Sequence, residues 1–399
     1  MRRYISYLVL LMVPLCLSAQ DSYELLLKAK SLADRGRLPE LISFLSGQPA
    51  SATDFRLKLM LADAKMNSGN YLGAEADYRD AEKLMAGSGQ YGLARISALK
   101  GDVRSSLYHL DKNIASQFRK SEKEIMLDPA FSVLENTSEW RAFWKTERYN
   151  ANDMRVSDIE YNLSSGNKED ALRMVQDMKS MYPGDEKTLF VTALALEFQQ
   201  KYQEAAAILI KLTETSFNET WLRALARVQT ESANYPGASD TYSKLISANV
   251  VDPSLFIRRA ECFRKTGETD KARTDIDKYL SLYPESQEAL SFAGRLEAEN
   301  GNSLKAMEYY SENLKLHPAN PQNYVDRANI YYMSKSWENA ISDYAMALDL
   351  KPDNPDAWLN KGISLLNKGN TEDACHDFRK ALSLGNKKAA SYISSNCIK

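Results

Sequence analysis

Glycine, proline, cysteine and histidine are scarce in this sequence of 399 residues, with 17, 12, 4 and 3 copies. Abundant Ala, Leu, Lys and Glu favour helix over sheet, because these residues lose little rotamer freedom in a helix. The three histidines lie far apart, and none has the i, i+4 spacing of a helical zinc pair. No charge of one sign dominates, since 51 Lys and Arg face 53 Asp and Glu. The sequence therefore predicts no metal, no cofactor and no nucleic-acid partner.

Long apolar runs are also missing, apart from one at the N-terminus. Arg2 and Arg3 precede an apolar stretch over residues 7–17, and the small residue Ala19 follows shortly after it. This pattern is typical of a secretory signal peptide, and the stretch is too short to cross a membrane. We therefore expect residues 1–19 to be a signal peptide that is removed, leaving a mature chain without a transmembrane segment.

The signal peptide predicts export but specifies the final location of the protein only in part. We expect the periplasm or the periplasmic face of an outer membrane, with secretion as a further destination. A lipid anchor on Cys16 is an alternative, but Leu15 stands where lipoprotein signals need a small residue.

The C-terminal half of the chain repeats itself with a period of 34 residues, in units that start at Glu219, Pro253, Gln287, Pro321 and Pro355. Two antiparallel helices joined by a short turn can approach closely only where small residues face each other. Such residues fill the eighth and twentieth positions of the units, and larger apolar residues fill the twenty-fourth, one helical turn further on. The eighth positions are Ala226, Ala260, Gly294, Ala328 and Gly362, the twentieth Ala238, Ala272, Ala306, Ala340 and Ala374, and the twenty-fourth Tyr242, Ile276, Tyr310, Tyr344 and Phe378.

This pattern closely resembles that of the tetratricopeptide repeat family. The resemblance implies an all-α solenoid, in which antiparallel helix pairs stack into a right-handed superhelix. By this resemblance residues 152–386 form an array of seven repeats, and residues 20–120 a degenerate N-terminal array. Residues 121–151, rich in aromatic side chains, break the pattern and form an irregular helical connector. Residues 387–399 contain a capping helix that covers the apolar face of the last repeat.

Three cysteines remain after signal removal, and two of them are candidates for a disulfide. Cys375 begins the second helix of the last repeat, and Cys397 ends the expected antiparallel cap helix, so the hairpin brings them together. An exported protein meets oxidising conditions in which such a bridge forms. The alternative is that both are free, small apolar side chains. Cys262 lies within a first helix and is expected to be buried.

In the repeat family, the first helices line a concave groove that receives an extended peptide or a partner helix. Carried over to this sequence, the inward positions give twelve candidate groove residues. Several are arginines, whose forked donors suit carboxylates, so an acidic partner segment is one hypothesis; pairing of these charges with Glu261 and Glu299 is the alternative. The candidates are Arg223, Arg227, Ile257, Glu261, Arg264, Ser291, Arg295, Glu299, Asn329, Tyr332, Leu359 and Ile363.

Three other features of the sequence are weaker indications of function. Chaperone-binding members of the family clamp a C-terminal carboxylate with a lysine at the fifth position, where this sequence has Val325 before Asn329. Residues 87–92 have the G-x-G-x-x-G spacing of a dinucleotide site, but a helix rather than a strand is expected before them. The aromatic residues of the connector form either an interaction surface or internal packing.

Together these features predict a protein-binding scaffold or adaptor outside the cytoplasm. The signal peptide and the terminal cysteine pair resemble those of exported repeat proteins in bacteria of the Bacteroides type, and this resemblance implies a role in cell-envelope assembly or secretion. A glycan- or peptidoglycan-associated accessory factor is the alternative within binding proteins. An enzyme built on a helical solenoid is the alternative of another class, and no catalytic residue is singled out in its support. The oligomeric state is not indicated by the sequence.

Overall fold

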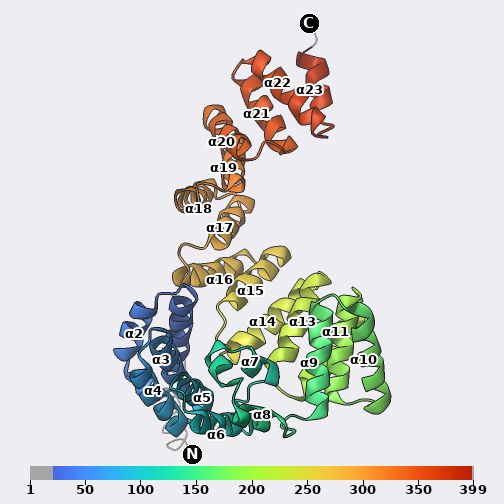
Figure 1. The fold of residues 1–399 in the computed structure, drawn as a ribbon. Helices are drawn as coiled ribbons and strands as arrows, with labels where there is room; N and C mark the ends of the chain where they lie inside the picture. Colours follow the sequence, from blue (N-terminus) through green and yellow to red (C-terminus); the bar gives the residue numbers. More distant parts are fainter. Residues whose placement is uncertain (1–20, 398–399) are drawn as a thin grey trace, which may run out of the picture. The chain divides into compact units, whose positions relative to one another are not determined.

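The computed structural model describes residues 21–397, so the expected signal peptide and Cys16 lie outside the described residues. Between residues 21 and 397 every regular element is helical, which confirms the all-α fold. The chain divides into two compact units, Met1–Leu255 and Phe256–Lys399. The irregular connector thus lies within unit 1. Figure 1 follows the helices along the chain.

Unit 1 consists of helical hairpins on both sides of the connector. Residues 21–34 form its first described helix. The elements that follow are α2 (Leu38–Ser46), η1 (Pro49–Ala52), α3 (Phe55–Asn67), α4 (Tyr71–Leu84), α5 (Gln90–Leu99), α6 (Val103–Ile114), α7 (Glu122–Met126), η2 (Pro129–Leu134), α8 (Ser138–Trp144), α9 (Ala151–Ser164), α10 (Lys168–Met181), α11 (Glu186–Phe198), α12 (Tyr202–Thr215), α13 (Glu219–Glu231) and α14 (Tyr235–Ser247).

Unit 2 continues the same hairpins without interruption. Helix α15 starts at the last residues of unit 1, and the capping helix α23 ends the unit. The elements are α15 (Ser254–Thr266), α16 (Thr269–Leu282), α17 (Gln287–Glu299), α18 (Ser303–Leu316), α19 (Pro321–Met333), α20 (Trp337–Leu350), α21 (Pro355–Asn367), α22 (Thr371–Ser383) and α23 (Ala389–Asn396).

The small residues lie where helices of one hairpin cross. A methyl group added to Gly294 would come within 2.6 Å of the Tyr310 ring, and one added to Gly362 within 2.7 Å of the Phe378 ring. The same crossing in the hairpin between them is formed by Ala328, which is fully buried. Larger side chains at these positions would push the two helices apart, so the repeat pattern reports close helix packing.

The turns inside the hairpins adopt the left-handed conformation whether or not they contain glycine. Gly301 and Gly369 have φ of +79° and +84°, as expected for a residue that ends a helix. Lys335 occupies the equivalent turn of the hairpin between them with φ of 59°. A side chain there costs roughly 1 kcal/mol relative to glycine, so tertiary packing imposes the turn.

The glycine-rich residues 87–92 span the end of the loop between helices α4 and α5 and the first turn of α5. Methyl groups added to Gly89 and Gly92 would lie 2.1 Å from the carbonyl oxygen and 2.2 Å from the ring of Tyr78. The glycines therefore allow α5 to approach α4. This packing role, together with the preceding helix, accounts for the motif without a bound nucleotide.

The aromatic residues of the connector pack internally. The rings of Phe131 and Trp140 stack with centroids 5.8 Å apart, and both side chains are buried with Phe143. They belong to one core cluster with Ala94 and Leu110 of helices α5 and α6. Of the two alternatives for this segment, the structure favours internal packing over an interaction surface.

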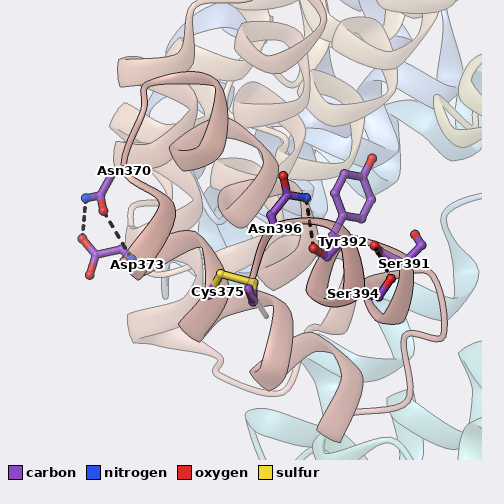
Figure 2. The surroundings of a disulfide bond; sticks show 8 residues. Asn370, Asp373, Cys375, Ser391, Tyr392, Ser394 and Asn396 are labelled. Atoms are coloured by element: carbon purple, nitrogen blue, oxygen red, sulfur yellow. Dashed lines mark hydrogen bonds between the residues drawn. A yellow bond between two sulfur atoms is a disulfide. The ribbon is translucent and has the colours of Figure 1, made fainter. Parts of the chain in front are cut away.

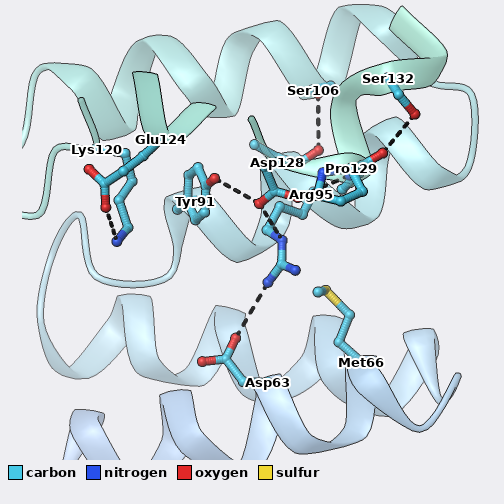
Figure 3. Close-up of polar contacts among 12 residues, drawn as sticks. Asp63, Met66, Tyr91, Arg95, Ser106, Lys120, Glu124, Asp128, Pro129 and Ser132 are labelled. Carbon is cyan, nitrogen blue, oxygen red and sulfur yellow. Dashed lines mark hydrogen bonds and ion pairs between the residues drawn. The ribbon is translucent and has the colours of Figure 1, made fainter. Parts of the chain in front are cut away.

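A polar network also ties the connector to the N-terminal hairpins (Figure 3). Arg95 of α5 lies between Asp128, 3.0 Å away at the start of η2, and Asp63 of α3, 3.9 Å away. The Tyr91 hydroxyl donates to Asp128 at 2.8 Å, and the Tyr78 hydroxyl donates to Asp63. Connector and N-terminal hairpins are thus one packed body.

The two ends of unit 1 meet. The hydroxyl of Tyr23, in the first described helix, donates to the carbonyl oxygen of Val250, 3.2 Å away and 227 residues later. Val251 packs against the cluster that contains Leu26 and Leu41. The unit therefore closes on itself between its first helix and the segment after α14.

The C-terminal cap of unit 2 is α23. Its Ala389 is fully buried, and the Tyr392 ring stacks on Phe378 with centroids 5.0 Å apart. The sulfur atoms of Cys375 and Cys397 lie at bonding distance, with Cα atoms 5.6 Å apart (Figure 2). The structure joins the two cysteines in the expected pairing, and their oxidation in the native protein stays a prediction.

Candidate functional site

A large hollow lies within unit 1, between the connector and three successive first helices, α9, α11 and α13. Its volume is about 780 Å³. We call it the connector cleft. One wall is formed by Arg119–Glu124, Met126 and Tyr149, and the other by Asp153, Met154, Val156, Ser157, Asp158, Glu160, Tyr161, Lys187, Phe190, Asn218, Thr220 and Trp221.

A second hollow of about 510 Å³ continues along the same three helices. We call it the helix cleft. It shares Glu160, Phe190 and Thr220 with the connector cleft, so the two form one groove. Its lining residues are Glu160, Leu163, Ser164, Phe190, Leu194, Glu197, Phe198, Thr220, Arg223, Ala224 and Arg227.

The repeat register explains which side chains face this groove. Two further repeat units, which precede the five regular ones, start at Asn152 and Glu186. All their inward positions (second, fifth, ninth, twelfth and thirteenth) line one of the two clefts. None of the groove residues predicted from sequence lies in these two units. The predicted Arg223 and Arg227 belong to the next unit, and both line the helix cleft.

Both of these arginines are already paired within unit 1. Arg227 donates to Glu197, with one N to O distance of 2.7 Å, and this hydrogen bond raises the pKa of Arg227. Arg223 donates to Glu219 at 2.9 Å and to Asp252 at 2.6 Å. An incoming carboxylate would have to compete with these partners.

The cationic side chains of the connector cleft also form ion pairs or ring contacts with neighbouring residues. Asp153 pairs with Arg119 at 2.7 Å and with Lys187 at 2.5 Å. Burial would raise the pKa of Asp153, but the hydrogen bonds from Lys187 and Arg119 outweigh it, and the pKa is lowered. Each of these cations therefore has a partner in the wall of the cleft.

The two remaining cations of this wall are held in the same way. Lys120 pairs with Glu124 at 2.9 Å, and the Lys123 ammonium lies 4.3 Å from the centre of the Tyr161 ring.

Glu160 differs from these groups. It forms no hydrogen bond or ion pair in the described structure, and it faces both clefts where they meet. Its side chain is reached by solvent, but the surrounding walls partly desolvate it and raise its pKa. Glu160 is therefore an unpaired carboxylate at the centre of the groove, beside the rings of Phe190 and Trp221.

The charged groove candidates of unit 2 form a network of their own. Arg264 donates to Glu261 and Glu299, each at 2.7 Å, and these contacts raise its pKa. This is the charge pairing that the sequence left open as an alternative to an acidic partner. Arg295 is exposed to solvent.

The uncharged candidates of unit 2 are mostly engaged in packing or hydrogen bonds. Ile257 and Leu359 are buried, and Ile363 packs against the last core cluster. Asn329 accepts a hydrogen bond from Tyr344 at 2.6 Å, and the Tyr332 ring meets Trp337 edge to face. Ser291 is within hydrogen-bonding distance of Asn313. Most of these side chains are therefore already in contact with other residues of unit 2.

Metal binding and membrane crossing are two further properties to consider for residues 21–397. These residues contain no group of three or more His, Cys, Asp or Glu side chains that could hold a metal ion. Across this same stretch, none of the helices has the length and apolar character needed to cross a membrane. The fold and groove define a helical-repeat protein of the kind that holds other polypeptides.

Comparison with known proteins supports this class. Tetratricopeptide repeat models match residues 257–321 and 355–387, and a TPR repeat model matches residues 328–369. These matches cover residues 257–321 and 328–387, so tetratricopeptide repeats make up this part of the chain.

Two curated relatives are similar over a short stretch. They are Hsp70-Hsp90 organizing protein 3 of Arabidopsis thaliana, 34% identical over 92 residues, and Hsp70-Hsp90 organizing protein 1 of Glycine max, 30% identical over 88 residues. The matches cover 23% and 22% of this chain but only 16% and 15% of those proteins. The similarity therefore concerns less than a quarter of this chain and about a sixth of each relative.

Two solved structures are similar to this chain at low sequence identity. The C-terminal part of a TPR repeat-containing protein from Cytophaga hutchinsonii is 13% identical, with a TM-score of 0.51, over 59% of this chain and 98% of that one. A tetratricopeptide repeat protein from Parabacteroides merdae is 21% identical, with a TM-score of 0.46, over 61% of this chain and 96% of that one.

Proposed function

We propose that this protein is an exported scaffold that holds a segment of another protein in the groove formed by α9, α11 and α13. The observation that carries the proposal is the continuity of the connector and helix clefts, which share lining residues across three successive first helices. Repeats of this family bind proteins, and a long groove fits an extended peptide or a partner helix better than a small molecule.

Export is the second part of the proposal. The N-terminal pattern over residues 1–19 and the pairing of Cys375 with Cys397 support a location outside the cytoplasm. We propose the periplasm or the periplasmic face of an outer membrane, or secretion, and a role in envelope assembly or secretion. That role rests on analogy with exported repeat proteins.

A photo-crosslinking amino acid placed in the groove of the full-length protein tests the proposal in native envelopes. Thr220 is exposed and lines both clefts, whereas Leu72 on α4 is 79% exposed and lines neither. We expect a discrete protein adduct from position 220 and none from position 72. Identical adducts from both positions, or none from position 220, would contradict the groove as the binding surface.

A glycan-binding accessory role is the second candidate, because Tyr161 and Trp221 line the connector cleft. Aromatic faces stack on sugars only where they are exposed. Trp221 is only 8% exposed, and Lys123 lies over the Tyr161 ring, so the cleft offers a limited stacking surface. Retention of the protein on purified peptidoglycan, lost on Tyr161→Ala, would favour this role over protein binding.

A further inference from the structure

We propose that the groove of unit 1 selects a basic segment: an extended stretch of a partner protein that places a Lys or Arg at Glu160 with apolar residues on either side. The inference rests on the proposed function, and it names the chemistry of the partner. It also departs from the acidic partner that the arginines suggest from sequence alone.

The distribution of paired and unpaired charges is the first argument. The cations that line the groove are all occupied by neighbouring carboxylates or, for Lys123, by an aromatic ring. The lining carboxylates Glu122, Asp158 and Glu160 have no hydrogen bond or ion pair in the described structure. The charged side chains that the groove leaves without a partner are therefore acidic, although its six cationic and six anionic lining side chains cancel in formal charge.

The position of Glu160 is the second argument. It belongs to both clefts, so a chain that follows the groove must pass it. Phe190 also faces both clefts, and Trp221 lines the connector cleft beside it. A Lys or Arg can lay its methylene stem along apolar walls and its charged head against a carboxylate, and aromatic faces attract cations.

The apolar residues along the groove are the third argument. Leu163, Leu194 and Phe198 line the helix cleft, and Met154 and Val156 line the connector cleft. Phe198 and Met154 are 40% and 43% exposed, so a ligand can reach them. A segment with apolar residues flanking its basic residue would cover both ends, whereas a uniformly basic segment would leave them exposed to water.

The test uses three labelled peptides of about twelve residues, long enough to span about 40 Å when extended. They share a Leu- and Phe-containing framework and carry Lys, Glu or Gln at the same positions. Fluorescence anisotropy with the full-length mature protein should show the Lys peptide binding most tightly. Glu160→Gln should weaken the Lys peptide about five- to tenfold, as expected for one charge pair in a partly enclosed site.

Glu214→Gln is the matched control, because Glu214 is exposed on α12, lines neither cleft and changes the net charge equally. It should alter affinity less than about twofold, since exposed distant charges are screened. Glu160→Lys should reverse the preference toward the Glu peptide. An unchanged affinity of Glu160→Gln, or tightest binding of the Glu peptide to the native protein, would overturn the inference while leaving a protein-binding groove in place. Failure of all three peptides, together with no adduct at position 220, would overturn both proposals.

Discussion

Reduction of the bond between Cys375 and Cys397 is expected to loosen the C-terminal cap selectively. Helix α23 has only eight residues, and helices below about twelve residues are marginal in water without tertiary contacts. The two cysteines are 22 residues apart, and releasing a loop of that size removes about 3 kcal/mol of stabilisation in the chain-entropy model. The cap would then depend on its noncovalent contacts, including those of Ala389, Tyr392 and Ile393.

Hydrogen exchange measured by mass spectrometry on the mature protein, with and without reductant, checks this magnitude. A loss of about 3 kcal/mol corresponds to exchange about 100-fold faster in α23 and the end of α22. Exchange in unit 1 should not change. The double variant Cys375→Ser/Cys397→Ser is the control, because reductant should have no effect on it. Equal exchange in α23 before and after a verified reduction would refute the reasoning, and free thiols at both positions in protein purified from the envelope without reductant would refute the bond itself.

Two further predictions concern the packing and charge of unit 2. Gly362→Ala should lower the free energy of unfolding by about 1 to 2 kcal/mol, because the clash of the added methyl group with the Phe378 ring costs more than the better helix propensity of alanine contributes. A double-mutant cycle with Phe378→Leu, measured by urea unfolding, should show a favourable coupling between the two substitutions. Strict additivity would argue against the clash. Burial would raise the pKa of Glu297, but hydrogen bonds from Arg273 and Asn302 outweigh it and lower the pKa, so its stabilising contribution is present above the unfolded value of about 4.3 and is lost as the pH falls through the lower folded value. Glu297→Gln should therefore destabilise by about 1 to 2 kcal/mol at pH 7 and have little effect near pH 3, and a constant difference across this range would contradict the ion pair.

Much of the fold could be predicted from the sequence, because the small residues that recur every 34 residues mark the positions at which helices cross closely. Helices α17, α19 and α21 begin at Gln287, Pro321 and Pro355, the residues at which the sequence units start. Ala328 and Gly362 lie at the helix crossings that their size suggested. The predicted domain boundaries stay predictions, since no comparison tests them.

The groove was harder to predict, for a physical reason. The units starting at Glu186 and Glu219 are 33 residues apart, one short of the regular period, so inward positions could not be extended upstream by simple counting. The connector wall of the cleft has no repeat register at all. Sequence also gives no indication of which charges pair across helices, as Arg227 does with Glu197 and Arg264 with Glu299.

The contact between Tyr23 and Val250 affects how unit 1 unfolds. A stack of hairpins with two free terminal repeats can unfold inward one hairpin at a time. A stack whose two terminal segments are in contact has no free terminal repeat from which unfolding can start. Residues 21–255 should accordingly open in a single sharp transition, and shortening the chain before Leu26 should weaken hairpins far along the sequence. In residues 256–397, melting should instead begin at a terminal hairpin and move inward.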